Sequence, residues 1–144
     1  MPNKDSDRIV RFYEVQQIPP GPSIWVPLVQ ATLITQAGGR INLPLLFDTG
    51  ASITTLRAEF YSILGLQSWD QGERASTATA GGTTDAYKYM ATLEIFDKTI
   101  TCPILLNNQF PFNPLYMGVL GRETVFNEFG FWENIHELYV TGNP

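Results

Sequence analysis

The chain has 144 residues, of which 44% are hydrophobic and 16% are charged, and its 9 Lys and Arg against 14 Asp and Glu give a net charge of −5. This length predicts one domain with a sizeable core, while the shortage of basic residues argues against a nucleic-acid partner and the lack of a long apolar run argues against a membrane span. The single cysteine, Cys102, and the single histidine, His136, exclude an internal disulfide and a metal site built on several such side chains, so no cofactor is expected.

Residues 1–22 are predicted to form an N-terminal arm, and residues 23–144 a single domain. The sequence Pro19-Pro20-Gly21-Pro22 at the end of the arm is incompatible with a regular helix or a central strand, because proline fixes φ and lacks a backbone N–H. No apolar stretch follows the charges of the first residues, MPNKDSDRIVRF, so no secretory signal is seen and a cytoplasmic location is expected.

Strands dominate the rest of the chain. A β-hairpin is predicted from residues 24–35 and 41–47, because both are apolar and Ala37-Gly38-Gly39-Arg40 between them has turn chemistry. Apolar and polar side chains alternate over residues 87–95, as in a strand with one buried face. Further strands are expected at residues 99–106, 116–120 and 137–140, and short helices at residues 56–64, with Gly65 as the cap, and at residues 122–129. These elements predict an all-β fold with a barrel-like or sandwich core.

The stretch Pro44-Leu45-Leu46-Phe47-Asp48-Thr49-Gly50-Ala51-Ser52 delivers an acid to the end of a buried strand. A carboxylate in that place is costly unless hydrogen-bond donors stabilise its charge. Thr49 offers a hydroxyl that ties down the local backbone, and Gly50 lets backbone amides approach the carboxylate because it has no Cβ. The plainer interpretation is a turn after a strand, since Asp and Gly are common turn residues.

A second apolar stretch, Tyr116-Met117-Gly118-Val119-Leu120, ends at Gly121-Arg122 just before the second expected helix. The segment LLFDTGAS, the short helix after it, a glycine-containing hairpin and the segment VLGRETV, in this order, resemble the retropepsin-like aspartic proteases, especially the small single-domain bacterial and cellular members. The resemblance covers about Val26 to Val140. It implies a retropepsin-like acid protease barrel with one or two short helices that works as a homodimer.

The resemblance also implies a mechanism, in which two carboxylates share one proton and Asp48 is the catalytic residue. The chain holds one Asp-Thr-Gly sequence, and Asp70, Asp85 and Asp97 stand in polar, turn-like contexts without an apolar strand before them. The second acid is therefore expected from a second copy of the chain across a two-fold axis. The implied function is a homodimeric aspartic endopeptidase, which hydrolyses a peptide or protein substrate with a water activated by two Asp48 carboxylates.

Other residues receive roles from the same resemblance. Support for the active site is expected from Thr49, Gly50, Ala51 and Ser52. A flap that closes over the substrate, and contacts to the substrate, are expected at Ala80, Gly81, Gly82, Thr83 and Phe112. An ordinary surface turn is the alternative for the glycines, and the aromatic rings of Phe110-Pro111-Phe112 are either walls of side-chain subsites or core anchors.

Two features depart from the family pattern. Retroviral members carry an acid at the position of Ser52, where it pairs with the arginine that corresponds to Arg122. Without that acid, Gly121 and Arg122 are expected to be structural, with the guanidinium on backbone carbonyls or on a carboxylate of the dimer mate. Relatives build the dimer with terminal strands, and residues 137–140 and 9–12 are the candidates here.

Two other hypotheses stay open at this point. The chain is alternatively a non-catalytic dimerisation or peptide-binding module, which keeps the fold without turnover, and a persistent monomer would favour this alternative. The other hypothesis is that the proline-rich arm before Pro22 blocks the cleft until it is cut.

Overall fold

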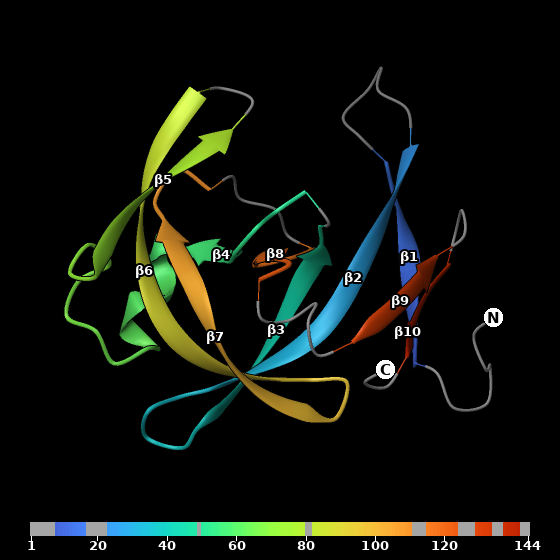
Figure 1. Ribbon diagram of the computed structural model, residues 1–144, viewed down its shortest axis with the longest axis horizontal. Helices are drawn as coiled ribbons and strands as arrows, with labels where there is room; N and C mark the ends of the chain where they lie inside the picture. Colours follow the sequence, from blue (N-terminus) through green and yellow to red (C-terminus); the bar gives the residue numbers. More distant parts are fainter. Residues whose placement is uncertain are drawn as a thin grey trace.

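Ten β-strands and one short 3₁₀ helix form the part of the protein that the computed structural model describes, namely residues 8–16, 23–48, 50–79, 82–110, 115–123, 129–133 and 137–141 (Figure 1). In chain order the elements are β1 (Arg8–Gln16), β2 (Ser23–Ile34), β3 (Arg40–Phe47), β4 (Thr54–Arg57), the 3₁₀ helix η1 (Ala58–Ser62), β5 (Glu73–Thr79), β6 (Gly82–Ile95), β7 (Lys98–Asn107), β8 (Gly118–Leu120), β9 (Gly130–Glu133) and β10 (Glu137–Thr141). The predicted all-β class is confirmed. Within these ranges no helix is long and apolar enough to cross a membrane.

Six of the strands close into a barrel. β2 pairs antiparallel with β3, β3 parallel with β8, β8 antiparallel with β4, β4 parallel with β7, and β7 antiparallel with β6. The ring closes because residues 92–94 of β6 pair with residues 32–34 of β2. Buried apolar side chains from these strands form the core, and the largest of those that are fully buried are Val29, Leu33, Leu43, Leu45, Leu56, Leu93, Ile95, Ile104, Leu106 and Leu120.

The strands β1, β10 and β9 lie beside the barrel, at the right of Figure 1. Residues 23–27 of β2 pair with residues 12–16 of β1, and residues 8–11 of β1 pair with residues 137–140 of β10. β9 pairs with the other side of β10. The two candidate dimer strands of the sequence analysis are therefore partners within one chain. β1 falls in the predicted arm, and the predicted boundary between arm and domain stays a prediction.

The predicted β2–β3 hairpin is confirmed, and its turn carries the expected glycines. The Thr35 N–H donates to the Gly39 carbonyl at 2.8 Å, and the Gly38 N–H donates to the Thr35 carbonyl at 2.9 Å. Gly38 has a φ of +85°, which suits glycine because it has no Cβ. The hairpin brings the chain back through the core and ends β3 at the mouth of the barrel.

The helix predicted over residues 56–64 is wrong in its first part. Leu56 and Arg57 belong to β4, where Leu56 is fully buried and pairs with Leu106 of β7 and with Gly118 of β8. Pairing on both sides therefore overrides the helical spacing, and only the turn η1 follows. The second predicted helix, 122–129, falls mostly on residues outside the described ranges, and β9 begins directly after it at Gly130.

The hairpin of β5 and β6 extends beyond the barrel, at the upper left of Figure 1. β6 pairs with β7 through residues 87–95, whereas residues 82–88 pair with β5. Between residues 82 and 86, β6 has β5 as its ladder partner. The hairpin thus projects as a two-stranded ribbon from a barrel that is paired on all sides.

Candidate active site

Asp48 follows the last residue of β3, at a point where the chain crosses the end of another strand. β8 lies between β3 and β4: Phe47 of β3 pairs with Leu120, and Thr55 of β4 pairs with Val119. The chain therefore leaves β3 at Asp48, passes round the end of β8 and returns on its far side as β4. Asp48 therefore lies next to the end of β8, the central one of these three strands.

Backbone hydrogen bonds fix the loop that carries the acid. The Asp48 N–H donates to the Leu120 carbonyl at 3.4 Å, and the Ala51 N–H donates to the Asp48 carbonyl at 3.2 Å. The Gly50 N–H donates to Oδ1 of Asp48 at 2.9 Å. A Cβ on Gly50 would lie 3.1 Å from the same oxygen. The carboxylate is thus oriented by the backbone of its own loop, as the sequence predicted for a glycine at this position.

The segment after β8 ties this loop to the barrel. The Arg122 N–H donates to the Ala51 carbonyl at 3.0 Å, and the Glu123 N–H donates to the Ser52 carbonyl at 2.6 Å. The Gly121 N–H donates to the buried Thr54 hydroxyl at 2.9 Å. A Cβ on Gly121 would lie 2.3 Å from the Ile53 carbonyl carbon, so this close approach requires glycine.

Arg122 has a weak side-chain partner in the position where retroviral members carry an acid. Its Nη2 donates to Oγ of Ser52 at 3.4 Å, and the pair is exposed. A long, exposed hydrogen bond to a neutral hydroxyl contributes little to stability. In this chain the guanidinium thus contacts a side-chain hydroxyl and not one of the expected carbonyl or carboxylate partners, and the structural role of Arg122 stays a prediction.

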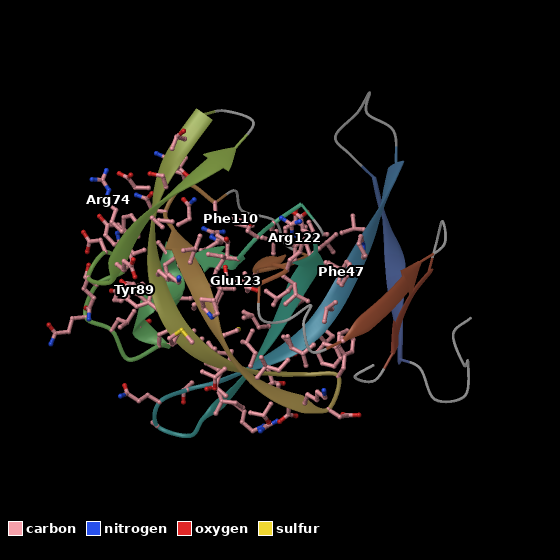
Figure 2. All side chains as sticks on the ribbon, viewed as in Figure 1. Phe47, Arg74, Tyr89, Phe110, Arg122 and Glu123 are labelled. Atoms are coloured by element: carbon pink, nitrogen blue, oxygen red, sulfur yellow. The ribbon has the colours of Figure 1, made fainter. Side chains whose placement is uncertain are left out.

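A cleft of about 510 Å³ opens next to Asp48. Figure 2 shows Phe110 near the middle of the molecule, beneath the β5–β6 hairpin, and Arg74 on the outer side of that hairpin. Among the described residues, Asp48 is the one carboxylate that faces the cleft. The lining consists of Asp48, Gly50, Ala51, Ser52, Ile53, Thr55, Ala75, Ser76, Leu105, Asn107, Phe110 and Val119.

Other reactive side chains lie away from the cleft. Cys102 is buried in the barrel core, and burial raises the pKa of its thiol to about 11, so it stays protonated and is a poor nucleophile at neutral pH. Asp85 accepts from Nη2 of Arg74 at 2.9 Å on the outer side of the hairpin, and this pair raises the pKa of Arg74. Within the described ranges no group of three or more His, Cys, Asp or Glu is placed to hold a metal ion. Among the described residues that line the cleft, Asp48 is therefore the one ionisable side chain.

The structure gathers part of the predicted site. Asp48, Gly50, Ala51 and Ser52 line one cleft, and the backbone N–H groups of Arg122 and Gly121 donate to Ala51 and Thr54 in the segment after Asp48. Gly82, with a φ of +122°, and Thr83 are exposed at the start of β6. The other predicted site residues, Thr49, Ala80, Gly81 and Phe112, lie outside the described residues.

Several cleft residues were missed in the sequence analysis. Ala75 and Ser76 come from β5, and Val119 comes from β8. Their small or apolar side chains give no chemical signal. Asn107 did carry one, because it is a polar residue directly after the apolar Ile104-Leu105-Leu106, just as Asp48 comes directly after the apolar end of β3.

Comparisons with known proteins agree with this geometry. A family model described as "Aspartyl protease" matches residues 29–123. A crystal structure of a retropepsin-like aspartic protease from Rickettsia conorii superimposes with a TM-score of 0.63 and 18% identity, over 93% of this chain and 98% of that chain. The EIAV protease complexed with the inhibitor HBY-793 gives a TM-score of 0.51 and 19% identity, over 76% of this chain and 89% of that chain. A search of curated proteins found no match. The fold is retropepsin-like, as predicted.

Proposed function

Because the chain belongs to the aspartyl protease family, we propose that it is a homodimeric aspartic endopeptidase in which Asp48 of two copies forms one catalytic pair. The observation that carries this proposal is the carboxylate of Asp48, which is the one acid among the described residues that line the cleft. Asp48 stands at the end of a buried strand, its Oδ1 accepts the Gly50 N–H at 2.9 Å, and the cleft beside it measures about 510 Å³. One copy supplies a rigid, oriented acid and half of the required pair.

The chemistry requires two carboxylates in different protonation states. The ionised carboxylate takes a proton from water as the water oxygen attacks the peptide carbonyl carbon. The protonated carboxylate donates its proton to the carbonyl oxygen, which gives a tetrahedral diol. Proton transfer to the amide nitrogen then allows the C–N bond to break. Two Asp48 side chains related by a two-fold axis supply both states, because like charges in contact favour one shared proton.

The remaining predicted residues take supporting roles in this proposal. Thr49, Gly50, Ala51 and Ser52 hold the loop of the acid, and Gly121 and Arg122 hold that loop against the barrel. Residues 80–83 at the tip of the β5–β6 hairpin act as the flap, with the peptide extended beneath them and hydrogen bonded through its main chain. The apolar lining from Ile53, Leu105, Phe110 and Val119 supports a preference for apolar side chains around the scissile bond, with Phe112 as a further contact.

The sheet of β1, β10 and β9 is our proposed dimer interface. Both strands predicted for the interface belong to it, and within the described ranges β9 is paired only with β10, so its other edge is available for pairing. An unpaired strand edge is a template for another strand. The cytoplasmic location expected from the sequence remains a prediction.

Replacement of the proposed catalytic acid tests the function directly. Asp48→Asn should lower peptidase activity at mildly acidic pH by about 10²-fold to 10⁴-fold or more, because the amide accepts no proton, while the unfolding midpoint stays near that of the original protein. Asp70→Asn, an exposed acid outside the cleft, is the matched control and should retain full activity. Survival of activity in pure Asp48→Asn protein would disprove the mechanism.

A mixed dimer separates the pair from a single acid. Two differently tagged chains, one of which carries Asp48→Asn, are combined and the heterodimer is purified. Its activity should be as low as that of the dimer in which both chains carry Asp48→Asn, because the catalytic pair needs both acids. Sedimentation across a concentration series should show a dimer in the range where activity appears. A monomer at every concentration would remove the pair and leave the non-catalytic binding module.

A further inference from the structure

Asn107 is a buried polar residue that the mechanism above does not use. It ends β7, the residue is 4% exposed, and it lines the cleft that holds Asp48. A buried amide costs free energy unless hydrogen bonds satisfy it. A polar residue in this place therefore needs defined partners, and their positions indicate what it does.

The partners of Asn107 come from two other segments. Its Nδ2 donates to Oγ1 of Thr84 at 2.8 Å, and Thr84 belongs to β6 in the β5–β6 hairpin. Its Oδ1 accepts the N–H of Gln109 at 2.8 Å, in the turn that leads to Phe110 of the cleft. One side chain thus joins the end of a barrel strand, the hairpin and the turn after β7.

The bond to Thr84 lies where the barrel stops supporting the hairpin. The ladder between β6 and β7 ends with Tyr87 opposite Leu106. Continued by one step it would place Ala86 opposite Asn107, yet the side chain of Asn107 reaches further, to Thr84. An isolated two-stranded ribbon is only marginally stable in water. A hydrogen bond at this point restrains the ribbon on the side that faces Asp48.

We propose that Asn107 is a positioning residue. Through its hydrogen bond to Thr84 it holds the β5–β6 hairpin in place over the cleft, and thereby raises the affinity for the peptide substrate. This inference rests on the proposed peptidase function. A hairpin that is already placed over the cleft loses less conformational freedom when the peptide binds beneath it. Loss of the tether should therefore weaken binding more than it slows the chemical step.

Thr84→Val tests the tether, because valine keeps the shape of threonine and removes the hydroxyl. KM for a peptide substrate should rise about threefold to tenfold, the usual effect of one lost hydrogen bond, while kcat changes by less than about twofold. Amide hydrogen exchange over residues 82–86 should accelerate, while exchange in the barrel strands stays the same. Thr84→Ser, which restores the hydroxyl, should restore both quantities.

The same strand offers a matched control. Thr92 of β6 shares a 3.3 Å hydrogen bond with Thr101 of β7 on an exposed face of the barrel. Thr92→Val removes the same group from the same pair of strands and should leave KM and hairpin exchange unchanged. Asn107→Ala is the second variant, which removes the donor to Thr84 together with the acceptor of the Gln109 N–H, and should raise KM and hairpin exchange at least as much as Thr84→Val.

Two results would overturn the proposal. If Thr84→Val matches Thr92→Val in both measurements, the bond does not restrain the hairpin. If exchange accelerates but KM does not move, the bond supports the fold and not the substrate. Exchange requires no turnover, so inactivity of the original protein would refute the peptidase function while the exchange comparison still decides whether the tether exists.

Discussion

The loop that carries Asp48 and the β5–β6 hairpin face the same cleft, but different contacts hold their backbones. Around Asp48 the bonds run from backbone to backbone, as in the Arg122 N–H to the Ala51 carbonyl at 3.0 Å and the Glu123 N–H to the Ser52 carbonyl at 2.6 Å. The hairpin depends on side chains where it leaves the barrel, such as Asn107 on Thr84 and the exposed Arg74–Asp85 pair.

This difference separates a part that must stay fixed from a part that must move. Backbone contacts around Asp48 tolerate few changes of residue, since Gly118 and Gly121 lie where a Cβ would meet neighbouring backbone atoms. Side-chain contacts break and re-form at a cost of about 1 kcal/mol each. An acid that must meet its counterpart from a second copy suits the first kind of support, and a hairpin that opens for a peptide suits the second.

The largest expected effect concerns glycine. A Cβ on Gly121 would lie 2.3 Å from the carbonyl carbon of Ile53 and 2.4 Å from the nitrogen of Thr54, and neither backbone atom moves cheaply. We expect Gly121→Ala to lower the free energy of unfolding by about 3 kcal/mol or more, as severe overpacking does. Urea titration followed by tryptophan fluorescence measures this.

The matched change lies on the hairpin. Gly82 has a φ of +122°, and a Cβ built on it meets no atom within 4 Å among the described residues. Gly82→Ala therefore adds backbone strain without a clash, and should cost about 1 kcal/mol. Equal losses for Gly121→Ala and Gly82→Ala would show that the two regions do not differ in the way we describe.

A smaller effect is expected from a buried side chain that supports the segment after Asp48. The hydroxyl of Thr54, which is 1% exposed, accepts the Gly121 N–H at 2.9 Å. Thr54→Val leaves that buried N–H without its acceptor and should cost about 1 to 3 kcal/mol. Thr54→Ser keeps the acceptor and should recover most of the loss in the same urea titration, whereas exposed Thr101→Val should cost little. If Thr54→Val leaves the free energy of unfolding unchanged, this bond does not have the role that we describe.

Much of the fold could be predicted because its signals are local. The β2–β3 hairpin has its glycine turn, and Asp48 stands out as an acid after an apolar strand. Leu56 shows where local signals fail: its spacing is helical, but long-range pairing with Leu106 and Gly118 makes it a strand. β1 is a similar case, since its partners in β10 come from the far end of the chain.

The candidate site could be predicted only where its residues are consecutive in the sequence, in the segment that begins with Asp48. Gly50, Ala51 and Ser52 follow the acid directly and share its cleft. Ser76 and Asn107 reach the same cleft from 28 and 59 residues further along, through the closure of the barrel. A short sequence motif does not predict that such distant residues line one cleft, because this depends on which strands become neighbours in the fold.

The smallest expected effect concerns the outer base of the β5–β6 hairpin, and it tests whether the hairpin and the loop that carries Asp48 are held independently. The hydroxyl of Tyr89 donates to the Trp69 carbonyl at 2.6 Å and accepts the Gly72 N–H at 2.8 Å. Tyr89→Phe removes both bonds but keeps the ring, and water can replace the hydroxyl because the site is only partly buried. We expect a loss of about 1 kcal/mol or less in global stability, with faster amide exchange at Gly72.

Exchange at Ala51 should stay unchanged, because its N–H bonds to the Asp48 carbonyl in the separately held loop. A parallel rise at Ala51 would mean that the hairpin base and the loop around Asp48 open as one unit, and the two kinds of support would then not be independent.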